Sequence, residues 1–276
     1  MNSTAFALIA CRRTGSNYLM KIFDSFPEME FFGEVYHRQT VWMPKERKKE
    51  YIEWLTATHN IKVKLSYEPF EDKELVNLNH EHPKYFLDFL VSTTKFKYAG
   101  FKVFPEHLHW RKLKSTLLAN REIPKIILKR NLLDVYISDR ILKLTNCSQN
   151  QDTSSIKIDF DCLDFQAWYF DVRLFYSRVE LFLKNSNQRY AELSYEEIHS
   201  YSNDVEKIEF LQSWLYENGI EVEHKPKVAN FIKKQDKRKQ PLVKVKNAEE
   251  VEKYLIDNNL DYLIRDRSQS KTLSFA

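Results

Sequence analysis

The segment Arg13–Asn17 (RTGSN) combines residue types that bind oxyanions, and it follows an apolar run. A glycine turn that opens a helix directs several backbone N–H groups at one point, and the helix dipole adds about half a positive charge there. Arg13 adds a forked cation, and Ser16 and Asn17 add side-chain donors. The segment is no Walker A loop, because no GK[ST] follows Gly15. On its own it fits a capped helix with an incidental arginine equally well.

A second segment of this kind lies more than one hundred residues further along the chain. Ile126–Arg130 (IILKR) is an apolar run that ends in a base, and a helix is predicted to begin at about Leu132. Helical periodicity places Ser138 on the same side as the strand end that carries Arg130. An arginine fork and a hydroxyl at this spacing can hold a second, separate phosphate.

Together the two segments resemble the sulfotransferase family that uses 3′-phosphoadenosine-5′-phosphosulfate (PAPS). RRTGSNYL at residues 12–19 resembles its 5′-phosphosulfate loop, and KRNLLDVYISDR at residues 129–140 resembles its 3′-phosphate motif. The resemblance implies a P-loop-like fold and a PAPS site, with the 5′ end of PAPS held by Arg13, Thr14, Gly15, Ser16 and Asn17 and its 3′-phosphate by Arg130 and Ser138.

Weaker similarity extends to other segments. GEVYH at residues 33–37 is similar to a segment of bacterial carbohydrate-type members, and GFK at residues 100–102 to a strand of such proteins. LSYEE at residues 193–197 implies that Tyr195 lies near the nucleotide. Lys233–Gln235 (KKQ) and the run LVKVKNAEEV that follows resemble a C-terminal loop that closes over the cofactor. The basic cluster at residues 233–239 also fits a solvated loop, and Lys234 is the candidate contact there.

The resemblance implies transfer of a sulfuryl group to a hydroxyl of a carbohydrate or other small molecule by in-line attack. Arg13 and Ser16 would stabilise the developing charge. Glu34 is the first candidate for the base and His37 the second. A surface carboxylate or a salt bridge to Arg12 fits Glu34 nearly as well, and a structural role fits His37 better.

No metal is required by this chemistry, and the sequence suggests no metal site. His80 and His82, like His107 and His109, stand two residues apart, which on a helix directs them to different sides. Exposed or structural histidines are the preferred interpretation.

The site segments follow apolar runs that alternate with helical patterns. Strands are predicted at Thr4–Ala10, Tyr98–Phe104, Lys125–Lys129 and Arg189–Leu193. Alternation of this kind favours an α/β fold with a P-loop NTPase-like central parallel sheet flanked by helices. Residues 1–276 are taken as a single domain, in which 38–97 and 145–160 are candidate acceptor-binding insertions or lids.

Composition and charge limit which other classes of function the sequence fits. The net charge of +4 fits a small anionic ligand as well as nucleic acid, and three widely spaced cysteines favour a reducing compartment. No run is long enough to span a bilayer, so a cytoplasmic protein without membrane or nucleic-acid partners is expected. The alternatives are another nucleotide-dependent transferase such as a kinase-like P-loop protein, a nucleic-acid module that uses residues 233–239, and an inactive nucleotide-binding scaffold.

Overall fold

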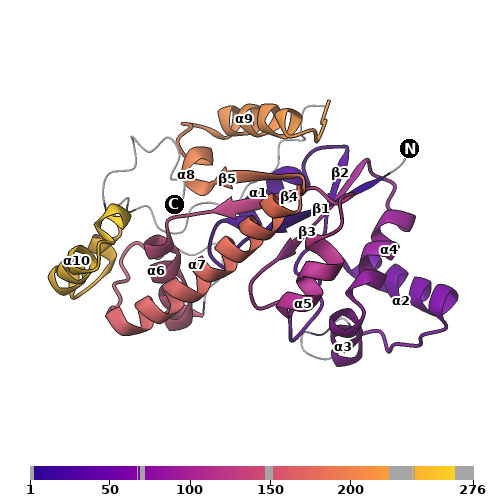
Figure 1. The fold of residues 1–276 in the computed structure, drawn as a ribbon, viewed down its shortest axis with the longest axis horizontal. Helices are drawn as coiled ribbons and strands as arrows, with labels where there is room; N and C mark the ends of the chain where they lie inside the picture. The colour runs from indigo at the N-terminus through magenta and orange to yellow at the C-terminus, as the bar shows by residue number, and fades with distance from the viewer. Residues whose placement is uncertain are drawn as a thin grey trace.

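The computed structural model describes residues 3–66, 68, 72–146, 152–223, 238 and 240–264. Within these residues, five parallel strands form one sheet in the order β2-β3-β1-β4-β5 (Figure 1). The α/β class with a central parallel sheet is therefore confirmed. The strands are β1 (Thr4–Ile9), β2 (Met29–Phe31), β3 (Tyr98–Val103), β4 (Lys125–Lys129) and β5 (Tyr190–Ser194).

The central strand β1 is covered on both faces, which explains its continuous apolar sequence. Phe6 and Leu8 point into one half of the core, and Ala7 and Ile9 point into the other. Because all five strands are parallel, their carboxyl ends meet at one edge of the sheet. β3 and β4 lie on opposite sides of β1, so the order of the strands reverses there. Such a topological switch point lies beside the carboxyl end of β1, and α/β proteins bind ligands at points of this kind.

Helices cover both faces of the sheet (Figure 1). One face packs against residues from α1, α8 and α9, and the other against residues from α2, α3, α4, η1, α6, α7 and α10. Their bounds are α1 (Ser16–Phe23), α2 (Lys45–His59), α3 (Lys73–Glu81), α4 (Pro83–Thr93), α5 (Trp110–Lys112), η1 (Leu113–Leu118), α6 (Leu132–Thr145), α7 (Cys162–Asn185), α8 (Tyr195–Ile198), α9 (Asp204–Glu217), η2 (Leu242–Lys244), α10 (Ala248–Asp257) and η3 (Asp261–Leu263).

The predicted elements differ from the observed ones in detail. The last predicted strand lies one residue further along, at Tyr190–Ser194, and the guanidinium of Arg189 donates to the carbonyl of Asn218 at the end of α9. Asn247 directly precedes α10, and its side chain does not cap that helix. Instead its Oδ1 accepts from Phe160 N at 2.9 Å, and its Nδ2 donates to Glu250.

The short strand β2 lies at the edge of the sheet and is separated from β1 by β3. The segment around Glu34 directly follows β2. It contacts the segment after β1 in two ways: His37 lies 3.3 Å from Arg12, and Lys102 of β3 contacts both Glu34 and Asn17. No described helix is both long and apolar enough to cross a lipid bilayer.

Candidate anion-binding site

The loop between β1 and α1 has a backbone that its sequence makes possible. Gly15, the N-terminal cap of α1, has φ +91°, and Arg13 also lies in the left-handed region at +65°. Thr14 is fully buried, and its hydroxyl donates to the carbonyl of Cys11 at 2.7 Å, so this side chain shapes the loop. Within the described chain no side chain caps α1, so the N–H groups that open this helix have no side-chain acceptor there.

The two predicted phosphate segments come together at the carboxyl edge of the sheet. Nε of Arg13 donates to the hydroxyl of Ser138 on α6 at 3.1 Å. The guanidinium of Arg130, at the end of β4, donates to the carbonyl of Arg13 at 2.8 Å. Loop, strand end and helix are thereby joined into one cluster, although they are more than one hundred residues apart in the chain.

This cluster places two guanidinium groups beside one another. Burial lowers the pKa of Arg13, and the neighbouring charge of Arg130 lowers it further. Nε of Arg130 is buried and has no hydrogen-bond partner in the described part of the chain. Two like charges side by side and a buried donor without an acceptor are each unfavourable, and an oxyanion bound between them would satisfy both.

Tyr195 forms one side of the cluster. It stands at the start of α8, directly after β5, and the guanidinium carbon of Arg130 lies 4.2 Å from the centre of its ring. The same ring lies so close to Gly15 that a Cβ there would approach it to 2.4 Å. Burial raises the pKa of the Tyr195 hydroxyl. Position 15 therefore requires glycine both for its φ and for this contact.

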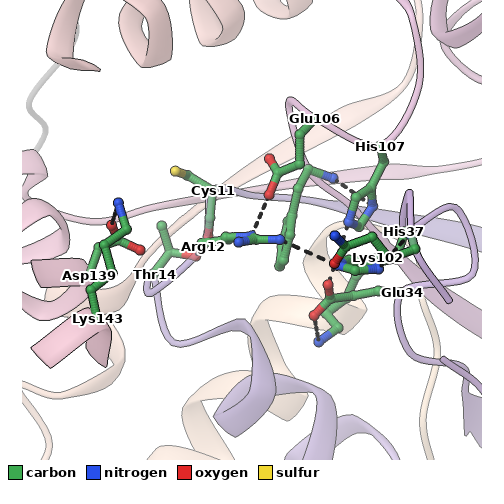
Figure 2. Close-up of polar contacts among 12 residues, drawn as sticks. Cys11, Arg12, Thr14, Glu34, His37, Lys102, Glu106, His107, Asp139 and Lys143 are labelled. Atoms are coloured by element: carbon green, nitrogen blue, oxygen red, sulfur yellow. Dashed lines mark hydrogen bonds and ion pairs between the residues drawn. The ribbon is translucent and has the colours of Figure 1, made fainter. Parts of the chain in front are cut away.

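On the other side of β1, a lysine of β3 connects the first loop to Glu34. Lys102 is buried, and its ammonium donates to Asn17 on α1. The same ammonium donates to Glu34 Oε1 at 3.1 Å (Figure 2). His107 is also buried and its Nδ1 accepts from Phe104 N at 3.2 Å. The proton is thus on Nε2, which faces Glu34 Oε2 at 3.5 Å, the long limit of a hydrogen bond.

These neighbours determine the charge of Glu34. Burial by itself raises the pKa of the carboxyl, but His107 and Lys102 outweigh it and lower the pKa to about 2. Burial also lowers the pKa of the Lys102 ammonium, which Glu34 partly restores. Glu34 is therefore a carboxylate throughout the neutral range, held by two buried partners.

His37, the second candidate base, is half-buried on the same side of the site. Burial lowers the pKa of its imidazole, so the ring is neutral at pH 7. One of its nitrogens lies 3.3 Å from the guanidinium of Arg12, and Arg12 also forms an ion pair with Glu106 (Figure 2). The suggested salt bridge between Glu34 and Arg12 is thus wrong: Glu34 pairs with Lys102 and Arg12 with Glu106.

The sequence interpretation missed His107 as a neighbour of Glu34. His107 lies in a turn after a buried strand, where no hydrophobic periodicity predicts the direction of a side chain. Its orientation is set by the turn Phe104–His107. Lys102 had a signal, because a lysine within an apolar strand requires a partner. Of the other candidates, Ser16 is buried in the first turn of α1, and Lys234 lies outside the described residues. In the described ranges, no three His, Cys, Asp or Glu side chains are grouped to bind a metal ion.

Comparison with known proteins gives a single kind of match. No protein-family model and no curated protein matches the sequence. Among solved structures, the fold is similar to the crystal structure of a sulfotransferase from Alicyclobacillus acidocaldarius, with 13% sequence identity, a TM-score of 0.44, and coverage of 96% of this chain and 97% of that one. At this level the similarity carries no information about activity or site residues.

Proposed function

We propose that this protein is a sulfotransferase that moves a sulfuryl group from PAPS to a hydroxyl of an acceptor, with a carbohydrate as the preferred acceptor class. The proposal rests on one observation above all, the cluster of Arg13, Arg130 and Ser138 at the switch point of the sheet. It joins the two segments that resemble the 5′ and 3′ motifs of the sulfotransferases. A nucleotide with phosphate groups at both ends is the ligand that uses both segments.

In this proposal Arg130 and Ser138 bind the 3′-phosphate, and Tyr195 packs beside them. Arg13 and the N-terminus of α1 face the phosphosulfate, whose charge spreads over the oxygens during transfer. Hydrogen-bond donors that are fixed before the reaction stabilise that charge without reorganisation. Lys102 contacts Asn17 of the same loop and provides a further cation near the leaving oxygen.

Glu34 is the proposed base for the acceptor hydroxyl. Its carboxylate is always available at neutral pH, and its contacts with Lys102 and His107 hold it in place. Positioned bases typically contribute ~10² to 10⁴ in rate. A pKa near 2 makes Glu34 a weak base, so it acts by orienting the hydroxyl and accepting its proton late, as the bond to sulfur forms.

The carbohydrate preference has support near Glu34. Trp42 is 45% exposed, and its backbone N–H lies 3.4 Å from the carbonyl of Glu34. Gly33 makes this approach possible, since a Cβ there would lie 2.7 Å from the Trp42 carbonyl oxygen. The backbone of Trp42 thus lies against that of the Gly33–Glu34 segment, and its exposed indole offers a flat apolar surface on which the C–H face of a sugar ring can stack.

Calorimetric titration with adenosine 3′,5′-bisphosphate tests the donor site. We expect binding without Mg²⁺, and we expect weaker binding of ATP whether or not Mg²⁺ is present. Tight binding of Mg²⁺–ATP with no affinity for the bisphosphate would contradict the proposal and favour a kinase-like protein. Transfer is then measured with sulfur-labelled PAPS and a panel of sugars, and donor binding without transfer to any hydroxyl compound would indicate an inactive scaffold.

A further inference from the structure

The long helix α7 carries a strip of exposed apolar side chains. Leu163, Phe170, Leu174 and Leu181 are 75%, 60%, 55% and 61% exposed, respectively. Figure 1 shows α7 running across the sheet as one of the longest elements of the molecule. Its opposite face is part of the core, where Phe165, Tyr169, Val172, Tyr176, Val179 and Leu183 are buried.

The strip has the spacing of a helix that packs against another helix. Steps of seven and four residues lead from Leu163 to Phe170 to Leu174, and a further seven lead to Leu181. Ala167 and Ser177 occupy the intermediate positions of the same 3–4 repeat. This repeat keeps one seam directed at a partner helix over several turns. The burial of α7 against its own core accounts for the other face only.

Its area is appropriate for a specific interface. Four large side chains at these exposures present roughly 400 Å² of apolar surface, a size at which patches on monomers are usually functional. Apolar atoms make up about 57% of the area of an ordinary protein–protein interface, so an interface that contains this strip would bury roughly 700 Å² per copy. That is close to the ~800 Å² per partner of a standard interface.

The charges along the strip indicate which partner fits. Asp171 and Arg178 are both exposed, lie seven residues apart on one edge of the strip, and straddle its centre at Leu174. The guanidinium of Arg178 lies over the ring of Trp110 in its own chain, at 5.0 Å from the ring centre, and keeps its charge exposed. Suppose that two copies of α7 pack antiparallel about a twofold axis beside Leu174. The twofold rotation then places this edge of one helix against the same edge of the other helix. Asp171 of each copy then lies opposite Arg178 of the other, and Phe170 lies against Leu181 of the second copy. A parallel pair would instead place Arg178 near Arg173 of the second copy, which is repulsive.

We propose that this protein forms a twofold-symmetric dimer through antiparallel packing of α7, with Asp171 of each copy paired with Arg178 of the other. Self-complementarity of this kind is what an isologous interface requires. The proposal is independent of the donor and acceptor chemistry, since none of the residues of the strip belongs to the anion-binding cluster.

Sedimentation velocity over about 1–200 µM tests the dimer. We expect wild-type protein to sediment as a dimer at the upper end of this range. Asp171→Arg and Arg178→Asp should each weaken the dimer at least tenfold, since each puts like charges opposite one another. Glu209→Arg on the exposed side of α9 is the matched control, and it should leave the dimer unchanged. Circular dichroism of each variant establishes that it is folded.

Charge exchange distinguishes the proposed arrangement from others. The double variant D171R/R178D should recover the dimer, and an equimolar mixture of the two single variants should form a heterodimer, because both pairs are then complementary again. Single variants that dimerise as wild type does, or a mixture that remains monomeric, would overturn the antiparallel pair. A wild-type monomer at 200 µM would overturn the dimer itself and would leave the strip to another occupant, such as the segment after residue 264 or a different protein.

Discussion

Nε of Arg13 donates to the hydroxyl of Ser138 at 3.1 Å, although the two residues stand 125 positions apart in the sequence. The bond fixes the direction of a guanidinium on a loop whose backbone is itself held by Arg130. Each of the two proposed phosphate sites thus supports the other. Removal of a side chain from one site should therefore weaken ligand binding at both sites, and to a larger extent at the site that loses the side chain.

Arg130→Ala should weaken binding of adenosine 3′,5′-bisphosphate about 100-fold, because hydrogen bonds to charged groups contribute roughly 1.5–3 kcal/mol each. Binding of an analogue without the 3′-phosphate should change only a few-fold. Isothermal titration calorimetry measures both. Arg121→Ala, at an exposed arginine ahead of β4, is the control and should have no effect. Equal losses for the two nucleotides would show that Arg130 does not bind the 3′-phosphate.

Gly15→Ala should abolish nucleotide binding and lower the thermal midpoint. Its φ of +91° is unfavourable for alanine, and the added methyl group would lie 2.4 Å from a ring carbon of Tyr195. Differential scanning fluorimetry with and without the bisphosphate measures both effects. In G15A/Y195A the collision is removed while the backbone strain remains, so only partial recovery is expected. Normal binding by G15A would mean that the loop plays no part in the site.

Glu34→Gln should lower stability at neutral pH, because it leaves the buried Lys102 without its carboxylate partner. A pKa lowered from 4.5 to about 2 corresponds to roughly 3 kcal/mol in favour of the folded state. For a lowered pKa this contribution is complete above pH 4.5 and is lost as the pH falls toward 2. Urea unfolding at pH 7 and pH 3 should therefore give a large difference between wild type and variant at pH 7 and a smaller one at pH 3.

The pH dependence of transfer distinguishes the two candidate bases. With Glu34 as the base, kcat should be nearly constant from about pH 5 to 8, and E34Q should lower it at least 100-fold while nucleotide affinity changes little. Lys102→Met removes a cation that lowers the pKa of Glu34, so the acidic limb should move upward. If His37 is the base, the limb instead follows the titration of His37 and disappears in His37→Gln, while K102M leaves it in place.

Trp42→Ala should raise the KM for a sugar acceptor about tenfold and leave the affinity for the bisphosphate unchanged. Stacking of a base on an aromatic side chain is worth about 1–3 kcal/mol, and a sugar ring should contribute at the lower end of this range. Trp42→Phe should retain most of the affinity, since it keeps a flat apolar surface. Steady-state kinetics at saturating donor measure this. If W42A acts equally on donor and acceptor, the indole supports the fold and does not bind the sugar.

Much of the sheet was predictable because its central strands are continuous apolar runs. Lys125–Lys129 was predicted with the bounds that the structure has, and the other three predicted strands within one residue at each end. β2 has only three residues and lies at an edge, so its sequence carries almost no periodicity. The strand order, which separates β2 from β1, depends on crossover packing that no local pattern records.

The candidate site was predictable to a similar extent. Arg13, Arg130 and Ser138 were identified from residue types and spacing and Tyr195 from a family resemblance, and the structure brings the four together. The pairing of Arg12 with Glu106 and of Glu34 with Lys102 was not predictable, because both acids are within reach of both bases until the turn after β3 is placed. His107 illustrates the same limit, since only the fold reveals that it faces Glu34.

The contact between Gly15 and the ring of Tyr195 also restricts how this chain can evolve. Any single substitution at position 15 meets the ring, and a smaller residue at position 195 removes the surface over which Arg130 lies. A substitution at either position alone therefore destabilises the site, and a second substitution at the other position restores only part of its stability. Lineages descending from this sequence should inherit glycine and tyrosine together, even where the segments around them have diverged beyond alignment.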